Sequence, residues 1–167
     1  MAYVSLPVID ASAEAFSRFG TFVASSEGFP LTGDASVTYR EKVGVMALAG
    51  PVSVGVLNLA TRGPQRFHEL ERHVATPELL VAVEGDVAFA VAPANQPAPA
   101  PDLSQVAAFR LRQGQAVIMH PGVWHGLPFP LGDRASLLVV FQEGTPDRDF
   151  QLADTQKDGG TTFTIEG

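Results

Sequence analysis

The chain has 167 residues, of which 46% are hydrophobic and only 17% are charged, so it can bury a core and is neither a disordered acidic tail nor a basic arm. Its 11 Lys and Arg residues against 18 Asp and Glu residues give a net charge of −7, which disfavours a nucleic-acid partner. The absence of cysteine excludes disulfides, thiolate metal ligands and cysteine nucleophiles.

Short β-strands separated by turns dominate the pattern along the chain. Residues 3–9 alternate weakly and predict a first strand. Asp10 or Ser12 is placed to cap a short helix that runs through Phe19 and stops at Gly20. Further strands are expected at 37–48, 52–60, 67–74, 79–83, 87–92, 107–111, 116–119 and 137–141.

Turns and loops complete this prediction. Residues 84–86 (Glu-Gly-Asp) separate two strongly apolar runs and predict a hairpin between them. Residues 94–102 are rich in Pro and Ala and predict an exposed loop, because proline cannot pair within a sheet. The polar tail from about Asp147 is expected to lie across the barrel or a partner subunit. Residues 1–167 therefore predict a single all-β domain, a small β-barrel or jelly roll with a short N-terminal helix.

No segment of the sequence has the features of a targeting peptide or a membrane span. The N-terminus lacks a basic flank and a long apolar stretch, and no run of about 18 apolar residues occurs. We therefore expect a cytoplasmic protein with no membrane partner.

All four histidines lie in two short stretches. His68 and His73 bound the first (HELERH), and His120 and His125 bound the second (HPGVWH). Because the chain has no cysteine, imidazole and carboxylate groups are its only strong ligands for a transition metal. The two stretches therefore predict one site.

Strand geometry predicts which of these side chains share a face. Residues two apart on a strand point the same way, so Glu71 and His73 are expected to face the interior together. His68 is then more peripheral, and Arg72 points away from Glu71. The Pro-Gly turn before Trp124 would let His125 approach the same site.

These two stretches carry a family resemblance. The spacing His-x4-Glu-x6-Gly from His73 resembles the first cupin motif, and Gly-x5-His-x-Gly-x2-His ending at His125 resembles the second. The strings HELERH and HPGVWHGLPF resemble the ureidoglycolate lyase family within the cupin superfamily. The resemblance covers most of the chain and implies a cupin-like barrel.

The resemblance also implies a metal site and a reaction. A typical metal cupin uses histidines and a glutamate, and one divalent ion (Zn, Ni, Mn or Fe) would be held here by Glu71, His73, Glu78 and His125. Glu71 stands where the first histidine is usual. The implied activity is a lyase acting on a small hydroxy or ureido carboxylate, with ureidoglycolate cleaved to glyoxylate and urea.

Such a cleavage needs a base, an acid and a cation for the anionic substrate. We assign His120 as the candidate for proton transfer, with Glu71 and His73 as further catalytic residues. Arg40 or Arg72 would bind the substrate carboxylate, because guanidinium groups hold carboxylates through two hydrogen bonds. Trp124 is a further candidate for substrate binding, as part of the pocket wall, and its alternative place is the core.

Several departures from the lyases leave the substrate open. Residues 74–80 read VATPELL where lyases continue Pro-Leu-Gly, Gly126 stands where they carry a histidine, and residues 142–143 are Gln-Glu in place of Asp-Arg. Glu78 restores the usual cupin glutamate where lyases carry glutamine. It favours the alternative of a metal-dependent cupin of another class, a dioxygenase, isomerase or hydrolase.

Other interpretations also remain open. The chain could be a non-enzymatic cupin that binds a small acid. His68 could be structural, His120 could be exposed to solvent, and Glu71 could pair with a surface cation. The resemblance implies a homodimer formed through edge strands and swapped ends, which the mean hydropathy of +0.13 favours.

Overall fold

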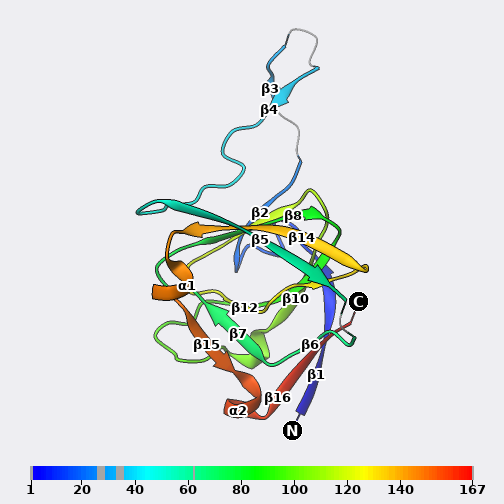
Figure 1. Ribbon diagram of the computed structural model, residues 1–167, viewed down its shortest axis with the longest axis vertical. Helices are drawn as coiled ribbons and strands as arrows, with labels where there is room; N and C mark the ends of the chain where they lie inside the picture. Colours follow the sequence, from blue (N-terminus) through cyan, green and yellow to red (C-terminus); the bar gives the residue numbers. More distant parts are fainter. Residues whose placement is uncertain (1, 26–28, 33–35, 62, 167) are drawn as a thin grey trace.

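The computed structural model describes residues 2–25, 29–32, 36–61 and 63–166 (Figure 1). Its strands in chain order are β1 (Ala2–Asp10), β2 (Gly20–Val23), β3 (Phe29–Pro30), β4 (Thr38–Tyr39), β5 (Val52–Ala60), β6 (Arg66–Phe67), β7 (Glu69–Arg72), β8 (Glu78–Glu84), β9 (Val87–Ala92), β10 (Ala107–Leu111), β11 (Ala116–Met119), β12 (Trp124–His125), β13 (Phe129–Pro130), β14 (Arg134–Gln142), β15 (Gln151–Asp154) and β16 (Thr161–Glu166). The helices are the 3-10 turn η1 (Leu103–Gln105), α1 (Thr145–Arg148) and α2 (Thr155–Gly159).

Apart from β3 and β4, which pair with each other, the strands form two facing sheets, which confirms the predicted all-β fold (Figure 1). The larger sheet has the order β15-β7-β12-β9-β10-β1-β16-β6, with β13 paired to β9. The smaller sheet has the order β2-β11-β8-β14-β5. The central strands of both sheets therefore face each other across the interior, where the site lies.

Strand β9 is buried on both faces and links two apolar clusters. Its odd-numbered residues, with Phe109 of β10, pack against Leu80 and Leu137 of the smaller sheet. Its even-numbered residues are alanines that face the opposite side, where they pack with Trp124 and Phe163. The larger sheet therefore separates two cores, and a side chain on this sheet belongs to one or the other according to its parity.

The predicted hairpin between β8 and β9 is wrong, although both strands exist. Strand β8 pairs with β11 and β14, whereas β9 pairs with β10, β12 and β13. Gly85 between them has a φ of +71°, and a Cβ there would lie 2.7 Å from the carbonyl oxygen of Arg134. Because β9 is apolar on both faces it occupies a central place, and the chain turns from one sheet into the other at Gly85.

The predicted N-terminal helix forms consecutive turns instead of a regular helix. The N–H groups of Phe16 and Gly20 donate to the carbonyl oxygens of Ser12 and Phe16, at 3.0 and 3.1 Å. The Ser12 hydroxyl accepts from the N–H of Ala15, as expected of a cap. Phe16 and Phe19 are buried against the inner core, so tertiary packing holds the segment without a continuous helix.

The predictions for two other segments, a strand and a loop, have different outcomes. The strand predicted at 37–48 is largely irregular and contains only β4, on a segment that projects from the barrel (Figure 1). The loop predicted at 94–102 lacks regular strand and helix, as expected. None of the helices among the described residues has the length and apolar character to cross a membrane.

Candidate active site

Side chains along β7 and at His73, the residue that follows it, point alternately to the two sides of the larger sheet. Leu70 is fully buried in the cluster that contains Trp124, and Arg72 lies over the Trp124 ring. Glu71 and His73 therefore face the opposite way, into the space between the sheets. The predicted parity of this strand is confirmed.

Four side chains converge between the sheets. His73 Nε2 lies 3.1 Å from a carboxylate oxygen of Glu78, the first residue of β8. His125 Nε2 lies 3.5 Å from the same Glu78 oxygen and 3.4 Å from a carboxylate oxygen of Glu71. His125 is brought beside Glu71 because β12 pairs with β7 at that register. The structure thus joins the four residues that the sequence suggested as metal ligands.

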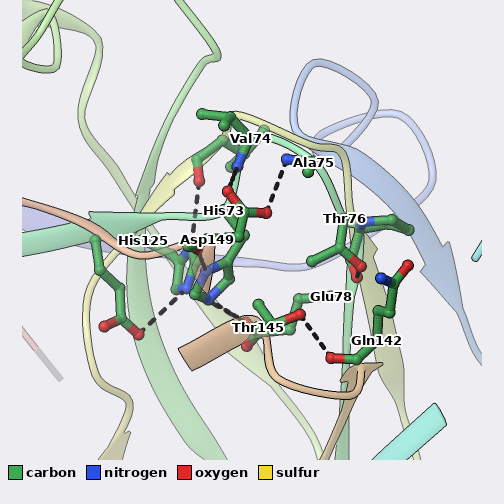
Figure 2. A network of polar contacts seen from close by, with 12 residues as sticks. His73, Val74, Ala75, Thr76, Glu78, His125, Gln142, Thr145 and Asp149 are labelled. Atoms are coloured by element: carbon green, nitrogen blue, oxygen red, sulfur yellow. Dashed lines mark hydrogen bonds and ion pairs between the residues drawn. The ribbon is translucent and has the colours of Figure 1, made fainter. Parts of the chain in front are cut away.

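Backbone carbonyl groups orient both imidazoles. The Nδ1 atom of His73 lies 2.5 Å from the carbonyl oxygen of Asp149, and that of His125 lies 3.2 Å from the carbonyl oxygen of Val123. With Nδ1–H donating in each ring, the Nε2 lone pairs face the shared centre, where Figure 2 shows His73, His125 and Glu78 pointing toward one another.

The cluster has the chemistry of a metal site. One ligand atom each from Glu71, His73 and His125 lie within 4.8 Å of one another. The Nε2 atom of His125 is buried and makes no hydrogen bond of good geometry. An orphaned imidazole nitrogen surrounded by carboxylates is costly unless a cation fills the space. Two imidazoles and two carboxylates suit Zn, Ni, Mn or Fe, so the residues could bind such an ion.

The pKa shifts of the residues in the cluster also indicate a site for a cation. Burial alone would lower the pKa of His73 and of His125, but the neighbouring carboxylates, Glu78 foremost, outweigh it and both pKa values are raised. Burial would raise the pKa of Glu71, yet the contact and charge of His125 outweigh it and this pKa is lowered. The carboxylates therefore attract positive charge, which protons supply when no metal ion does.

Two cavities that share several lining residues reach this cluster. An inner chamber of about 180 Å³ is lined by all four residues, together with Leu80, Phe141 and other apolar side chains. An outer cavity of about 720 Å³ is lined by Glu71 and His125 but also by His68 and Arg66. Glu71 and His125 therefore line both spaces.

A family comparison identifies the kind of protein to which this site belongs. The model of the family described as "Ureidoglycolate lyase" matches residues 5–159. The chain belongs to the ureidoglycolate lyase family. It is similar to the ureidoglycolate lyase of Escherichia coli strain K12, with 26% identity over 158 residues that cover 92% of this chain and 98% of that one. The ureidoglycolate lyase of Shigella boydii serotype 18 matches with the same identity and coverage.

Solved structures resemble this chain more loosely. The oxalate decarboxylase of Lactobacillus farciminis in a formate complex superposes with a TM-score of 0.43 and 18% identity, over 65% of this chain and 28% of that one. Peruvianin-I, a cysteine peptidase from Thevetia peruviana latex, gives a TM-score of 0.44 and 16% identity, over 62% and 56% of the two chains. The chain thus spans about a quarter of the length of the oxalate decarboxylase chain.

Two residues suggested for substrate binding in this lyase-family chain lie on the other side of the larger sheet. Trp124 is fully buried in the second core, and its Nε1–H donates to Asn95 at 3.0 Å. The Arg72 guanidinium lies 4.3 Å from the Trp124 ring centre and donates to Gln151 and the carbonyl oxygen of Ala98. Because they alternate with Glu71 and His125 along their strands, the structure does not bring them to the cluster.

Two further residues that the sequence suggested for the site, one for proton transfer and one for substrate binding, also lie apart from the cavities. His120 is exposed, beside the turn after β11, and lines neither cavity. Arg40 directly follows β4, is exposed and lines neither cavity. Neither position could be excluded by strand periodicity, because both follow the end of a regular strand.

Asp149 is a residue at this site that sequence periodicity does not indicate. Its carboxylate accepts hydrogen bonds from the N–H groups of Val74 and Ala75, each at 2.8 Å, while its carbonyl oxygen holds His73 (Figure 2). The polar tail was expected to lie across the barrel, and here α1 and β15 bring Asp149 against β7. Asp149 thus fixes the ring of His73 and the backbone of the two residues that follow it.

Replacing Asp149 with alanine keeps its carbonyl group but removes the carboxylate that holds the backbone after His73, and it is expected to weaken divalent-metal affinity about 10- to 100-fold because that metal ligand is less well oriented. Titration of the chelator-treated protein with zinc against a colorimetric chelator measures this. Asp147→Ala is the matched control, because Asp147 is an exposed acidic residue of α1 with a free side chain at the surface. Equal affinities in the two variants would show that the Asp149 carboxylate does not position His73.

Proposed function

We propose that the chain is a metal-dependent lyase that cleaves ureidoglycolate into glyoxylate and urea. Family membership supports the reaction class. The observation that carries the proposal is the convergence of His73, His125, Glu71 and Glu78 on one buried point at the end of an open cavity. A divalent ion bound by these four side chains would polarise the hydroxyl and carboxylate of the substrate and acidify the hydroxyl.

Glu71 is the best-placed base. It lines both cavities, and its pKa is lowered by the contact and charge of His125 in spite of burial, so its carboxylate is ionised. In the reaction the base removes the hydroxyl proton, the carbon–oxygen double bond of glyoxylate forms, and the carbon–nitrogen bond to urea breaks. The leaving nitrogen then requires a proton from a second group.

His68 is positioned to supply that proton. It lines the outer cavity, and its Nδ1 atom lies 3.1 Å from a carboxylate oxygen of Asp154. An imidazole oriented by a carboxylate through one nitrogen can transfer a proton through the other. This assigns to His68 the role that the sequence suggested for His120, and Arg66 on the cavity wall gives the anionic substrate a positive charge to approach.

Replacing His68 with asparagine is expected to lower kcat by about 100-fold or more while metal content stays unchanged, because the acid is lost but the ligands remain. Steady-state release of glyoxylate, with metal analysis of the same samples, measures both quantities. His120→Asn serves as the control and should keep full activity. A wild-type kcat in the His68 variant would remove this histidine from the mechanism.

The experiment that tests the proposed function is an assay of the purified, metal-loaded protein with ureidoglycolate. Glyoxylate and urea should appear in equal amounts, and treatment with a chelator should abolish the reaction. A metal-loaded protein that produces neither compound would refute the proposal. That result would favour a metal-dependent enzyme of another class, the alternative that the presence of Glu78 beside both histidines supports.

A further inference from the structure

The outer cavity is large and apolar for a substrate as small and polar as ureidoglycolate. Cavities of about 300–1,000 Å³ ordinarily hold drug-sized ligands, and ureidoglycolate has only about nine non-hydrogen atoms. The inner chamber of about 180 Å³ is closer to its size, whereas the outer cavity has about 720 Å³. The outer cavity therefore has room for a substituent that ureidoglycolate lacks.

Three large apolar side chains form a wall of this outer cavity. Leu127 is 67% exposed, Leu152 is 50% exposed and Phe150 is 47% exposed, and all three line it. We call these three residues the apolar wall. Exposed apolar groups gathered at the entrance to a cavity mark a surface that buries an apolar ligand.

The apolar wall adjoins the cluster directly. Leu152 on β15 is the register partner of Glu71 on β7, and Glu71 is in turn the partner of His125 on β12. The ring of Phe150 lies 6.4 Å from that of His73. A ligand whose polar end reaches Glu71 and His125 therefore places its other end against the apolar wall.

The chemistry of the reaction determines which end of the substrate lies against the apolar wall. The hydroxyl and carboxylate of the substrate belong at the cluster, so the amide that leaves extends into the outer cavity. We propose that the preferred substrates are carbinolamides of glyoxylate that carry an apolar acyl group on nitrogen, in place of the carbamoyl group of ureidoglycolate. This inference rests on the proposed lyase function and specifies its substrate class.

The reaction of such a substrate balances in the same way. The hydroxyl proton passes to the base, the carbon–nitrogen bond breaks as the aldehyde of glyoxylate forms, and the nitrogen gains a proton to give the free primary amide. No oxidant, reductant or further reactant is needed.

The test compares two substrates on the same metal-loaded protein, ureidoglycolate and N-benzoyl-α-hydroxyglycine. Glyoxylate release gives kcat/KM for each, and we expect the benzoyl compound to exceed ureidoglycolate about tenfold or more because the wall buries its ring. Turnover of ureidoglycolate with no preference for the benzoyl compound would overturn this inference and leave the proposed function standing. Release of glyoxylate from neither would overturn both.

Variants of the wall distinguish ring binding from other uses of this surface. Leu127→Ser and Leu152→Ser should each lower the ratio of the two kcat/KM values about three- to tenfold. Val56→Ser is the matched control, because Val56 is 64% exposed on β5 and lines neither cavity, and it should leave the ratio unchanged. An unchanged ratio in the wall variants, with a dimer dissociating to monomers in sedimentation, would instead assign the wall to a second copy of the chain.

Discussion

Replacing His125 with alanine is expected to weaken divalent-metal binding by more than about 100-fold and to abolish metal-dependent activity. His125 contributes the buried Nε2 atom that makes no good hydrogen bond, and it is the residue that contacts both Glu71 and Glu78. Its removal leaves the two carboxylates with one imidazole. Isothermal titration of the chelator-treated protein with zinc measures the affinity.

The control for this variant is His120→Ala. It removes an imidazole from the same histidine-rich stretch, but His120 is exposed and lines neither cavity. Its metal affinity should match that of the unmodified protein. If His125→Ala bound zinc as tightly as this control, the ion would have to lie elsewhere and the cluster would lose its assigned role.

Replacing Trp124 with alanine is expected to lower the free energy of unfolding by about 3–5 kcal/mol, as truncation of a fully buried aromatic side chain does. The indole fills the second core, donates to Asn95 and lies under the Arg72 guanidinium. Urea denaturation measures the loss. Trp124→Phe keeps most of the apolar volume and should be closer to the unmodified protein.

A substrate-contacting role for Trp124 predicts a different outcome. Truncation would then lower kcat/KM while the urea midpoint stayed unchanged. The fold instead predicts that truncation lowers the urea midpoint more than it lowers kcat/KM. The side chain points away from Glu71 and His125 and into a core that holds the larger sheet in place.

The sequence predicted the composition of the cluster because local rules apply to it. The period of two along a strand placed Glu71 and His73 on one face, and the resemblance to the cupin motifs added Glu78 and His125. The structure brings these four together. The same period predicted that Arg72 points the other way, which its packing on Trp124 confirms.

Contacts between distant segments could not be predicted in this way. Asp149 binds residues 74 and 75 from the C-terminal tail, and no repeating pattern links positions so far apart in the chain. The two runs on either side of Gly85 looked like a hairpin because the turn is short, yet each strand found other partners. Tertiary pairing decided both features, and local sequence does not encode it.

The role of His68 shows the same limit. Strand parity predicted a peripheral side chain for His68, and its ring contacts Asp154, the N-cap residue of α2. That pair forms only because β15 joins the larger sheet beside β7. A peripheral position in the sequence pattern therefore still allows contact with the outer cavity.

The most direct test of the account is the position of a bound ion in crystals grown with zinc, located by diffraction data collected on both sides of the zinc absorption edge. We predict one anomalous peak between the sheets, about 2.0–2.2 Å from the Nε2 atoms of His73 and His125 and from oxygens of Glu71 and Glu78. A peak at His68, Glu69 and Asp154 instead, or no peak at the cluster, would contradict it.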